Sequence, residues 1–239
     1  MKKFTVLLLL LICAAVGAAE PKGWREATTP TEETETVKWR KFWQPRFKKK
    51  LAQAQQQGKA IDVVLVGDSL THNWDNRKQF GYQKTFKGHT VLNLGFGGDR
   101  TEHTLWVIGN DDLWKNLDPK LVVLLIGTNN TPRYSPEATI EGIRLCIAGL
   151  KKRAPHAKIV LFAILPRGKD KSFFLRAKID RVNAGIEKFA DGKTVFFENI
   201  NSRFLHPDGT IVEEAMQPDL LHLSAEGYRI WAEALKKYL

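Results

Sequence analysis

A serine, an aspartate and a histidine stand in this sequence where they could act together in nucleophilic catalysis. Ser69 follows the apolar run Ile61–Val66, and Asp219 and His222 lie three positions apart near the C-terminus. A serine hydroxyl becomes a nucleophile when a base takes its proton, and a histidine can do this near neutral pH. A neighbouring aspartate orients the histidine and stabilises the imidazolium. We therefore predict Ser69 as nucleophile, His222 as general base and Asp219 as its orienting carboxylate.

Acyl transfer by such a triad also needs hydrogen-bond donors for the oxyanion of the tetrahedral intermediate. Gly98 follows a second apolar run, and Asn129 follows a third. The backbone N–H groups of Ser69 and Gly98 and the side-chain amide of Asn129 would supply three donors. Taken singly, Ser69 could be a helix cap, Gly98 part of a tight turn and Asn129 a loop-stabilising residue. Taken together, they predict an oxyanion hole.

The elements that must position these residues are short apolar runs that alternate with helical stretches. Five runs predict strands, at 61–66, 90–94, 121–126, 158–164 and 194–197. Helical patterns occupy 37–59, 101–116, 136–153, 172–190 and 225–238. Consecutive apolar residues, as in Val63–Val66 and Val122–Leu125, are typical of strands buried on both faces of a parallel sheet. We therefore predict an α/β fold, a three-layer α/β/α sandwich around a mainly five-stranded parallel sheet. In open sheets of this class, sites form beyond the carboxyl ends of the strands.

The polar blocks after these runs resemble those of the SGNH (GDSL) hydrolase superfamily. The blocks are Gly67-Asp68-Ser69, the glycine block ending at Gly98, Gly127-Thr128-Asn129 and Asp219-x-x-His222. Within that superfamily the chain is similar to the catalytic subunits of platelet-activating factor acetylhydrolase and their bacterial relatives, over Asn93–Asp99, His103–Trp106, Gly127–Asn130, Leu165–Gly168 and Leu221–Ser224. The resemblance runs from about Ile61 to Tyr238. It implies a flavodoxin-like SGNH hydrolase fold and carboxylic ester hydrolysis.

The resemblance also implies an acyl pocket. In the acetylhydrolase branch, the residues next to the serine, the oxyanion asparagine and the histidine close off the acyl site, and here these are Leu70, Thr128 and Leu221. Side chains of this size would leave room for a short acyl group such as acetyl. The alternative is that all three are core residues. His103, which follows the glycine block, either lines the substrate cleft or lies on a helix surface.

The N-terminus has the layout of a secretory signal peptide. Met1–Lys3 is basic, Phe4–Val16 is apolar, and Gly17–Ala19 offers small residues for cleavage. We expect a signal peptide over 1–19, a linker or N-terminal arm over 20–36, and one hydrolase domain over 37–239, in a secreted or periplasmic protein. An uncleaved anchor is the alternative, but the apolar run is short for a bilayer, so we expect no stable membrane insertion.

Charge and motifs exclude several other classes of function. The chain carries 37 lysine and arginine residues against 26 aspartate and glutamate residues, a net charge of +11. These charges are scattered and no nucleic-acid motif accompanies them, so we predict a solvated basic surface and no nucleic-acid partner. No histidines occur at a zinc spacing, and the glycine block is not the dinucleotide fingerprint, so we predict neither metal nor cofactor. The aromatic residues Trp39, Phe42, Trp43 and Phe47 either cover the sheet or stack on sugar rings.

These observations predict a secreted serine esterase that removes acetyl or another short acyl group from an oxygen. Export would bring it to acetylated glycans, so the expected substrate is an O-acetylated carbohydrate or another small acyl ester. The alternative is a lipid esterase acting on acetylated phospholipid or longer acyl chains. A third reading is a non-catalytic glycan-binding module, against which the intact set of catalytic residues argues. The sequence indicates no particular oligomeric state.

Overall fold

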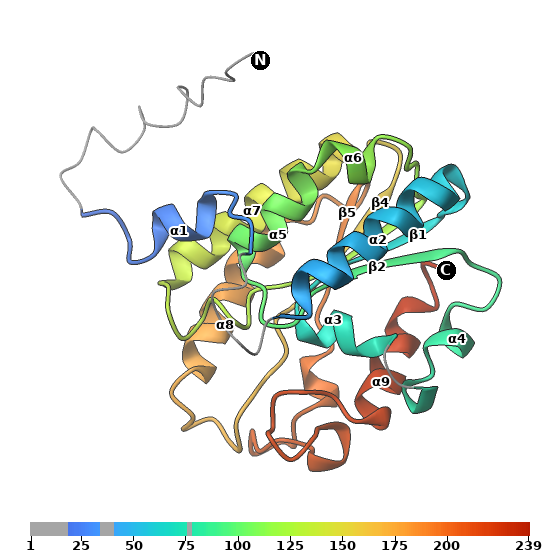
Figure 1. Ribbon diagram of the computed structural model, residues 1–239. Helices are drawn as coiled ribbons and strands as arrows, with labels where there is room; N and C mark the ends of the chain where they lie inside the picture. Colours follow the sequence, from blue (N-terminus) through green and yellow to red (C-terminus); the bar gives the residue numbers. More distant parts are fainter. Residues whose placement is uncertain (1–18, 34–40, 76–77) are drawn as a thin grey trace.

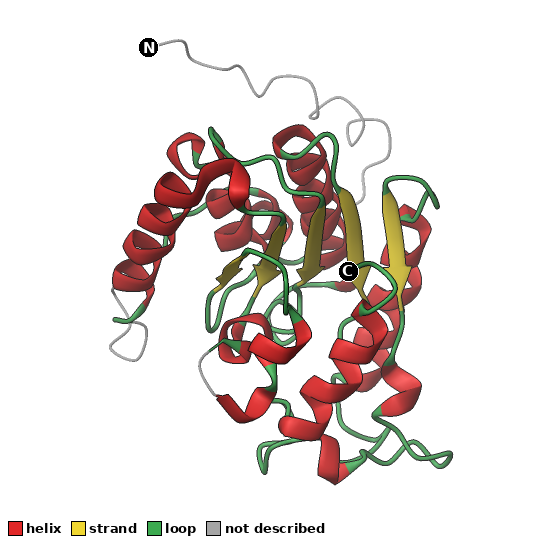
Figure 2. Ribbon diagram, turned by 90° about the vertical axis from the view of Figure 1, so that its right-hand side faces the viewer, coloured by secondary structure: helices red, strands yellow, loops and turns green. Residues whose placement is uncertain are grey.

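The computed structural model describes residues 19–33, 41–75 and 78–239, in which helices cover both faces of a central sheet (Figure 1 and Figure 2). The five strands are β1 Val63–Gly67, β2 Val91–Gly95, β3 Leu121–Leu125, β4 Lys158–Phe162 and β5 Val195–Glu198. They pair in parallel in the order β2-β1-β3-β4-β5. Each predicted apolar run supplies one strand, and the predicted α/β fold with a five-stranded parallel sheet is confirmed.

The helices fall between the strands and at both ends of the chain. The α-helices are α1 Trp24–Thr28, α2 Trp43–Gln57, α3 Ser69–Trp74, α4 Tyr82–Thr85, α5 Thr101–Gly109, α6 Asp111–Trp114, α7 Pro136–Arg153, α8 Arg176–Ile186 and α9 Ala225–Leu235. Short 3-10 helices occupy Gly58–Ala60, Lys78–Phe80, Glu187–Phe189, Asn201–Arg203 and Glu213–Ala215.

The stretch predicted as a helix over 172–190 forms α8 and the following 3-10 helix, from Arg176 to Phe189, and that over 225–238 is helical as far as Leu235. Two further predicted helices differ more from the helices observed. The stretch predicted as one helix over 101–116 is divided into α5 and α6, because the Asn110 side chain accepts the N–H of Leu113 and caps a new helix. The helix predicted over 37–59 begins at Trp43 as α2, and residues 37–40 lie outside the described residues.

Side chains of the strands alternate between two hydrophobic cores, one on each face of the sheet. Val64 and Leu124 belong to the core shared with α2, α5, α7 and α8. Leu65 and Val123 belong to the core shared with α3 and α9. Because both faces are covered, both sets of alternating positions must be apolar. This explains why the strand sequences read as unbroken apolar runs.

The described part of the predicted N-terminal arm is packed against the domain. Helix α1 lies beside α7 and α5 (Figure 1). Ala27 is fully buried, and the Thr101 hydroxyl donates a hydrogen bond to the Ala27 carbonyl at 2.8 Å. The N–H of Ser135 donates to the Lys22 carbonyl, also at 2.8 Å. Gly142 permits the approach, because a Cβ there would lie 2.7 Å from the Ala27 carbonyl oxygen. This segment is therefore a docked arm and not a loose linker.

The predicted signal peptide lies, except for Ala19, outside the described residues. Cleavage after Ala19 and export of the protein stay predictions. Over the ranges that the structure describes, no helix combines the length and the hydropathy needed to cross a membrane.

Candidate active site

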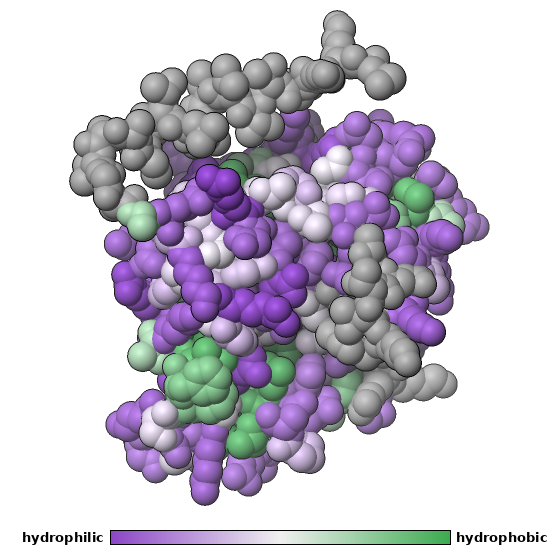
Figure 3. All heavy atoms as spheres, turned by 60° about the vertical axis from the view of Figure 1, so that its left-hand side comes forward, coloured by the Kyte–Doolittle hydropathy of each residue, from purple (hydrophilic) through white to green (hydrophobic). Residues whose placement is uncertain are grey.

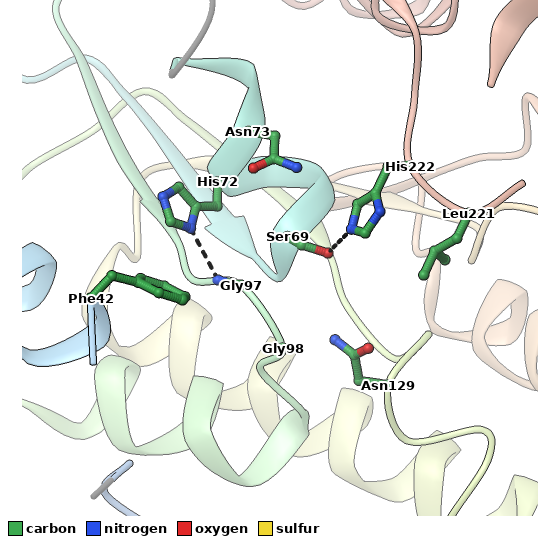
Figure 4. A pocket seen from close by; sticks show the side chains of 9 residues that line it. All are labelled: Phe42, Ser69, His72, Asn73, Gly97, Gly98, Asn129, Leu221 and His222. Carbon is green, nitrogen blue, oxygen red and sulfur yellow. Dashed lines mark hydrogen bonds between the residues drawn. The ribbon is translucent and has the colours of Figure 1, made fainter. Parts of the chain in front are cut away.

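Ser69 is the first residue of α3, directly after β1 ends at the carboxyl edge of the sheet (Figure 4). Asp68 caps this helix, because its Oδ1 accepts the N–H of Leu70 at 3.0 Å. Gly95 ends the neighbouring strand β2 without a side chain, and a Cβ there would lie 2.4 Å from the backbone nitrogen of His72. Helix α3 can therefore pack closely over the strand ends and hold Ser69 at a fixed place.

A continuous hydrogen-bonded chain joins Ser69 to His222 and Asp219. The Oγ of Ser69 lies 2.9 Å from Nε2 of His222, and Nδ1 of His222 lies 2.6 Å from Oδ2 of Asp219. The other oxygen of Asp219 accepts the backbone N–H groups of Leu221 and His222, at 3.0 and 2.9 Å. The turn between them holds Leu220 at φ 51°, an uncommon conformation for leucine. The structure thus brings together the three residues that the sequence singled out.

The charge and the hydrogen bonds of Asp219 and His222 favour proton transfer from Ser69. Partial burial works to raise the pKa of Asp219, but hydrogen bonds from the His222 side chain and from the backbone of His222 and Leu221 hold that pKa below its ordinary value. An ionised Asp219 accepts the Nδ1–H of His222, which leaves Nε2 with its lone pair toward the Ser69 hydroxyl. Ser69 therefore faces a base in the correct tautomer.

Gly98 and Asn129 lie beside Ser69 on the wall of the cleft (Figure 4). Gly98 has φ 78°, a conformation that glycine adopts without strain. One N–H of the Asn129 amide donates to the Asp99 carbonyl at 2.9 Å. A primary amide has two N–H donors, so this bond orients the amide and leaves the second N–H for a ligand. The residues predicted as oxyanion donors are therefore together in space.

A cavity of about 300 Å³ opens over Ser69. Beyond the triad and the predicted oxyanion donors, it is lined by Phe42, His72, Asn73, Gly97 and Leu221. Figure 4 shows Ser69 between two unlike ends of this cavity, with Leu221 at one end and Phe42 at the other. Leu221 supplies an apolar side chain at its end, close to His222, whereas Phe42 supplies an aromatic ring at the other end, where the polar side chains of His72 and Asn73 also line the cavity.

Two of the three residues predicted to form the acyl pocket are buried away from this cavity. Leu221 lines it, but Leu70 and Thr128 are 1% and 2% exposed and are not among the described residues that line it. Successive residues of a helix point about 100° apart, so Leu70 faces the core when Ser69 faces the cleft. The alternative that these are core residues therefore holds for Leu70, and Thr128 is buried in its loop.

His103 also lies away from the cavity. It is 3% exposed on α5, its Nε2 lies 2.8 Å from a carboxylate oxygen of Glu33, and its Nδ1 accepts the N–H of Arg100 at 3.1 Å. The prediction that His103 lines the cleft is wrong, and so is a place on the helix surface. The reason is the docked N-terminal arm, which brings Glu33 over this part of α5.

Three side chains that line the cleft were not predicted as part of the site. Phe42 belonged to a set of aromatic residues with two interpretations, and the structure divides that set, because Trp43 is fully buried in the core while Phe42 lines the cavity. His72 and Asn73 follow Ser69 by three and four positions. Residues so spaced share one face of a helix, so the helix expected after Ser69 was a usable signal for both.

Comparison of the sequence with a family model and with single proteins leads to the same family of hydrolases. The model of the GDSL-like lipase/acylhydrolase family matches residues 65–230. Platelet-activating factor acetylhydrolase IB subunit alpha1 of Bos taurus is 35% identical over 187 residues, which cover 78% of this chain and 78% of that protein.

Two solved structures have a similar fold. A GDSL-like lipase from Bacteroides thetaiotaomicron superposes with a TM-score of 0.65 and 22% identity, over 81% of this chain and 95% of that one. A carbohydrate acetylesterase family member from Sinorhizobium meliloti superposes with a TM-score of 0.55 and 18% identity, over 74% of this chain and 95% of that one. At these identities the likeness is one of fold.

Proposed function

The chain belongs to the GDSL-like lipase/acylhydrolase family and is a carboxylic ester hydrolase, and we propose that it removes acetyl or another short acyl group from an oxygen of a carbohydrate. The observation that carries the proposal is the hydrogen-bonded chain from Ser69 through His222 to Asp219, which opens into a cleft lined by Gly98 and Asn129. Its two parts, the reaction and the substrate, have separate support.

The reaction follows from the geometry of the site. His222 takes the proton of Ser69 as its Oγ attacks the ester carbonyl, and Asp219 stabilises the resulting imidazolium. The N–H groups of Ser69 and Gly98 and the amide of Asn129 hold the oxyanion. When the intermediate collapses, the alcohol leaves with the proton of His222 and the acyl group stays on Ser69. Water, deprotonated by His222, then releases the acid and restores the serine.

The preference for a short acyl group rests on the Leu221 end of the cavity. Leu221 lies next to His222 in sequence and lines the cleft, so its side chain bounds the space on that side of Ser69. A cavity of about 300 Å³ is small for an acyl chain and an alcohol together. Acetyl fits such a space, and each further methylene would meet the leucine.

The carbohydrate half of the proposal rests on the opposite end. Phe42 offers an aromatic ring and Asn73 an amide, a combination that suits a sugar ring with its apolar C–H face and its hydroxyl groups. The fold likeness to a carbohydrate acetylesterase agrees with this assignment. The relatives named as platelet-activating factor acetylhydrolases agree with the acetyl part.

A specific observation favours a second candidate, an acetylated lipid. Phe174 is 74% exposed, and it lies in the loop between β4 and α8. That loop contacts the turn before Leu221, because the N–H of Gly168 donates to the Leu220 carbonyl at 2.9 Å. Figure 3 shows a gathered apolar patch on one face of the molecule, which a lipid tail could contact.

The test is a substrate panel with matched variants. We expect p-nitrophenyl acetate to give a higher kcat/KM than the butyrate, with a discrimination of roughly 1–3 kcal/mol for each added methylene group. The octanoate should react hardly at all. Leu221→Ala should shift the optimum to longer chains. Ser69→Ala should lower kcat by about 10³-fold or more. EDTA should have no effect, since the mechanism uses no metal.

The alcohol is identified by acetate release. Acetylated mono- and oligosaccharides should react faster than an acetylated phospholipid presented below its critical micelle concentration. An optimum at eight carbons, or a faster reaction with the phospholipid, would contradict the carbohydrate proposal and support the lipid candidate. Wild-type turnover by Ser69→Ala would contradict the mechanism itself.

A further inference from the structure

His72 contacts the loop that carries Gly98. Its Nδ1 accepts the backbone N–H of Gly97 at 3.1 Å, the interaction drawn as a dashed line in Figure 4. Its ring lies against Phe42, with centroids 5.2 Å apart. His72 thus touches the residue immediately before Gly98 and lies on α3 one turn after Ser69.

Gly97 and Gly98 are the central residues of a turn that the N–H of Asp99 closes by donating to the Phe96 carbonyl at 3.1 Å, and the hydrogen bond to His72 restrains this turn further. Two consecutive glycines have wide conformational freedom, and Gly98 has a positive φ of 78°. Before this segment, the N–H of Phe96 donates to the Gly67 carbonyl at 2.9 Å. After it, the Asp99 carbonyl accepts from the Asn129 amide at 2.9 Å. The bond from Gly97 to His72 lies between these two anchors, one peptide unit from the N–H of Gly98.

His72 can accept this hydrogen bond only when its Nδ1 carries no proton. Burial is the main cause that lowers the pKa of His72, and the Arg46 charge adds to it, so that the pKa is about 4. Asp75 works in the opposite direction and Lys50 in the same direction as Arg46. Both cations come from α2 and pair with Asp75, at 3.4 Å for Arg46 and 2.9 Å for Lys50. The imidazole therefore stays neutral at the pH where a histidine base works.

We infer that His72 is a positioning residue for the oxyanion hole, which by accepting the Gly97 N–H holds the Phe96–Gly97 peptide and so restrains the adjacent peptide, which presents the Gly98 N–H to the oxyanion. The inference rests on the proposed function, because it takes Gly98 as an oxyanion donor. His72 does not serve as a second base for Ser69, since the lone pair of its Nδ1 is engaged by Gly97. Its effect belongs to the transition state, so it acts on kcat and little on KM.

The experiment compares two variants of equal size. In His72→Asn, the amide oxygen takes the place of Nδ1 as an acceptor, whereas His72→Leu has nearly the same shape and no acceptor. With p-nitrophenyl acetate, His72→Leu should lower kcat by about 10- to 100-fold and change KM by less than about 3-fold, since a misplaced oxyanion donor costs up to about 10²-fold. His72→Asn should stay within about 3-fold of wild-type kcat. The control His156→Leu, at an exposed turn, should leave kcat unchanged.

A pH series checks that His72 acts in its neutral form, whereas the pair His72→Leu and His72→Asn separates a hydrogen-bond acceptor from a packing role. Because His72 does not change its charge between pH 5 and 8, the ratio of kcat for His72→Asn to kcat for wild type should be constant over that range. Equal kcat for His72→Leu and His72→Asn, or a ratio that changes with pH, overturns the inference. Should His72→Leu fail to fold, His72→Ala against His72→Asn makes the same comparison. If Ser69→Ala keeps its activity, the proposed function fails instead, so the two failures are distinguishable.

Discussion

At the scale of single residues, the site depends on groups whose charge is set by their surroundings. Asp219 is kept ionised by hydrogen bonds within its own turn, and His72 is kept neutral by burial and by Arg46. Asp68 is the third case. It is fully buried next to Ser69, and burial raises its pKa to about 7, against smaller opposing effects of the Leu70 N–H and of His222. Asp219 and Asp68 can each be tested by substitution to asparagine, which replaces one carboxylate oxygen by an amide N–H₂ group.

The first prediction concerns Asp219→Asn. The amide oxygen can still accept the N–H groups of Leu221 and His222, so the turn is kept. The amide N–H₂ group now faces Nδ1 of His222, which favours the wrong tautomer and leaves no acceptor for the Ser69 proton. We expect kcat for p-nitrophenyl acetate to fall by up to about 10⁴-fold with an unchanged melting temperature. A variant of normal kcat would remove Asp219 from the mechanism.

The second prediction concerns Asp68→Asn. The pKa of Asp68 is about 7 in the folded protein against 3.8 for the ordinary carboxyl, so folding binds a proton between these values. The stability that this group contributes is therefore present below about pH 4 and is lost as the pH rises to 7. An asparagine can still cap α3 and does not titrate. We expect the Tm of Asp68→Asn relative to wild type to be higher at pH 8 than at pH 4.5; a difference independent of pH would contradict this.

At the scale of elements, the site is assembled where the ends of β1, β2 and β3 meet helix α3 and the C-terminal turn. Close packing of α3 on β2 is the part that depends most on residue type. The Asn93 side chain donates to the Thr71 carbonyl and accepts the N–H of Gly95, both at 2.8 Å. Together with the missing side chain at Gly95, these bonds fix the distance between the strand and the helix that carries Ser69 and His72.

The third prediction tests this packing with Gly95→Ala. The new Cβ would lie 2.4 Å from the His72 backbone nitrogen and 2.6 Å from the Cβ of Thr71, so α3 must move. We expect a loss of about 1–3 kcal/mol in the free energy of unfolding, measured with urea, and a lower kcat. The matched control is Gly109→Ala, whose Cβ would have no atom within 4 Å and which should be neutral or stabilising. Equal effects of the two variants would contradict the packing argument.

At the scale of the whole molecule, the N-terminal region has two parts, the predicted signal peptide over 1–19 and the arm that follows it and packs on the domain. Residues after the predicted cleavage site form α1 and pack on α5 and α7, the helices beside the loops that carry Gly98 and Asn129. The arm therefore packs on the helix layer that contains α5 and α7, where the Thr101 hydroxyl donates to the Ala27 carbonyl. The docking of the arm and the cleavage of the predicted signal peptide are tested by separate experiments.

The fourth prediction tests the docking with Ala27→Arg. A long charged side chain cannot stay at a fully buried position, so the arm should detach. The loss of stability is limited to the free energy with which the arm docks on the domain. We therefore expect Tm, measured by calorimetry, to fall by roughly 2–8 °C. Glu26→Arg, at the neighbouring exposed position, is the control and should leave Tm unchanged. A wild-type Tm for Ala27→Arg would show that the arm contributes no stability.

The fifth prediction concerns export. With the full chain expressed in a bacterial host, we expect the protein in the periplasm or the medium with an N-terminus at Glu20, determined by intact-mass measurement. Leu9→Arg interrupts the apolar run Phe4–Val16 and should keep the protein in the cytoplasm with its N-terminus uncleaved. Export of both chains, or a mature protein that begins at Met1, would contradict the signal peptide.

What the sequence by itself determined were the features written in short stretches of chain. Strands buried on both faces leave unbroken apolar runs, so all five were predictable, and the polar blocks at their ends led to Ser69, Gly98, Asn129, Asp219 and His222. The bond between Asp219 and His222 is also local, because three residues span it.

Only the tertiary structure decided which side chains reach the cleft. Leu70 and Thr128 lie next to site residues in sequence and are nevertheless buried, while Phe42, which immediately precedes α2 and lies 27 positions before Ser69, lines the same cavity. His103 points to the docked arm, and His72 meets Gly97 only because α3 packs on the end of β2. The physical reason is that the local sequence does not fix where a side chain points. The direction of a side chain depends on how its element packs, and packing is settled by contacts between residues far apart in the chain.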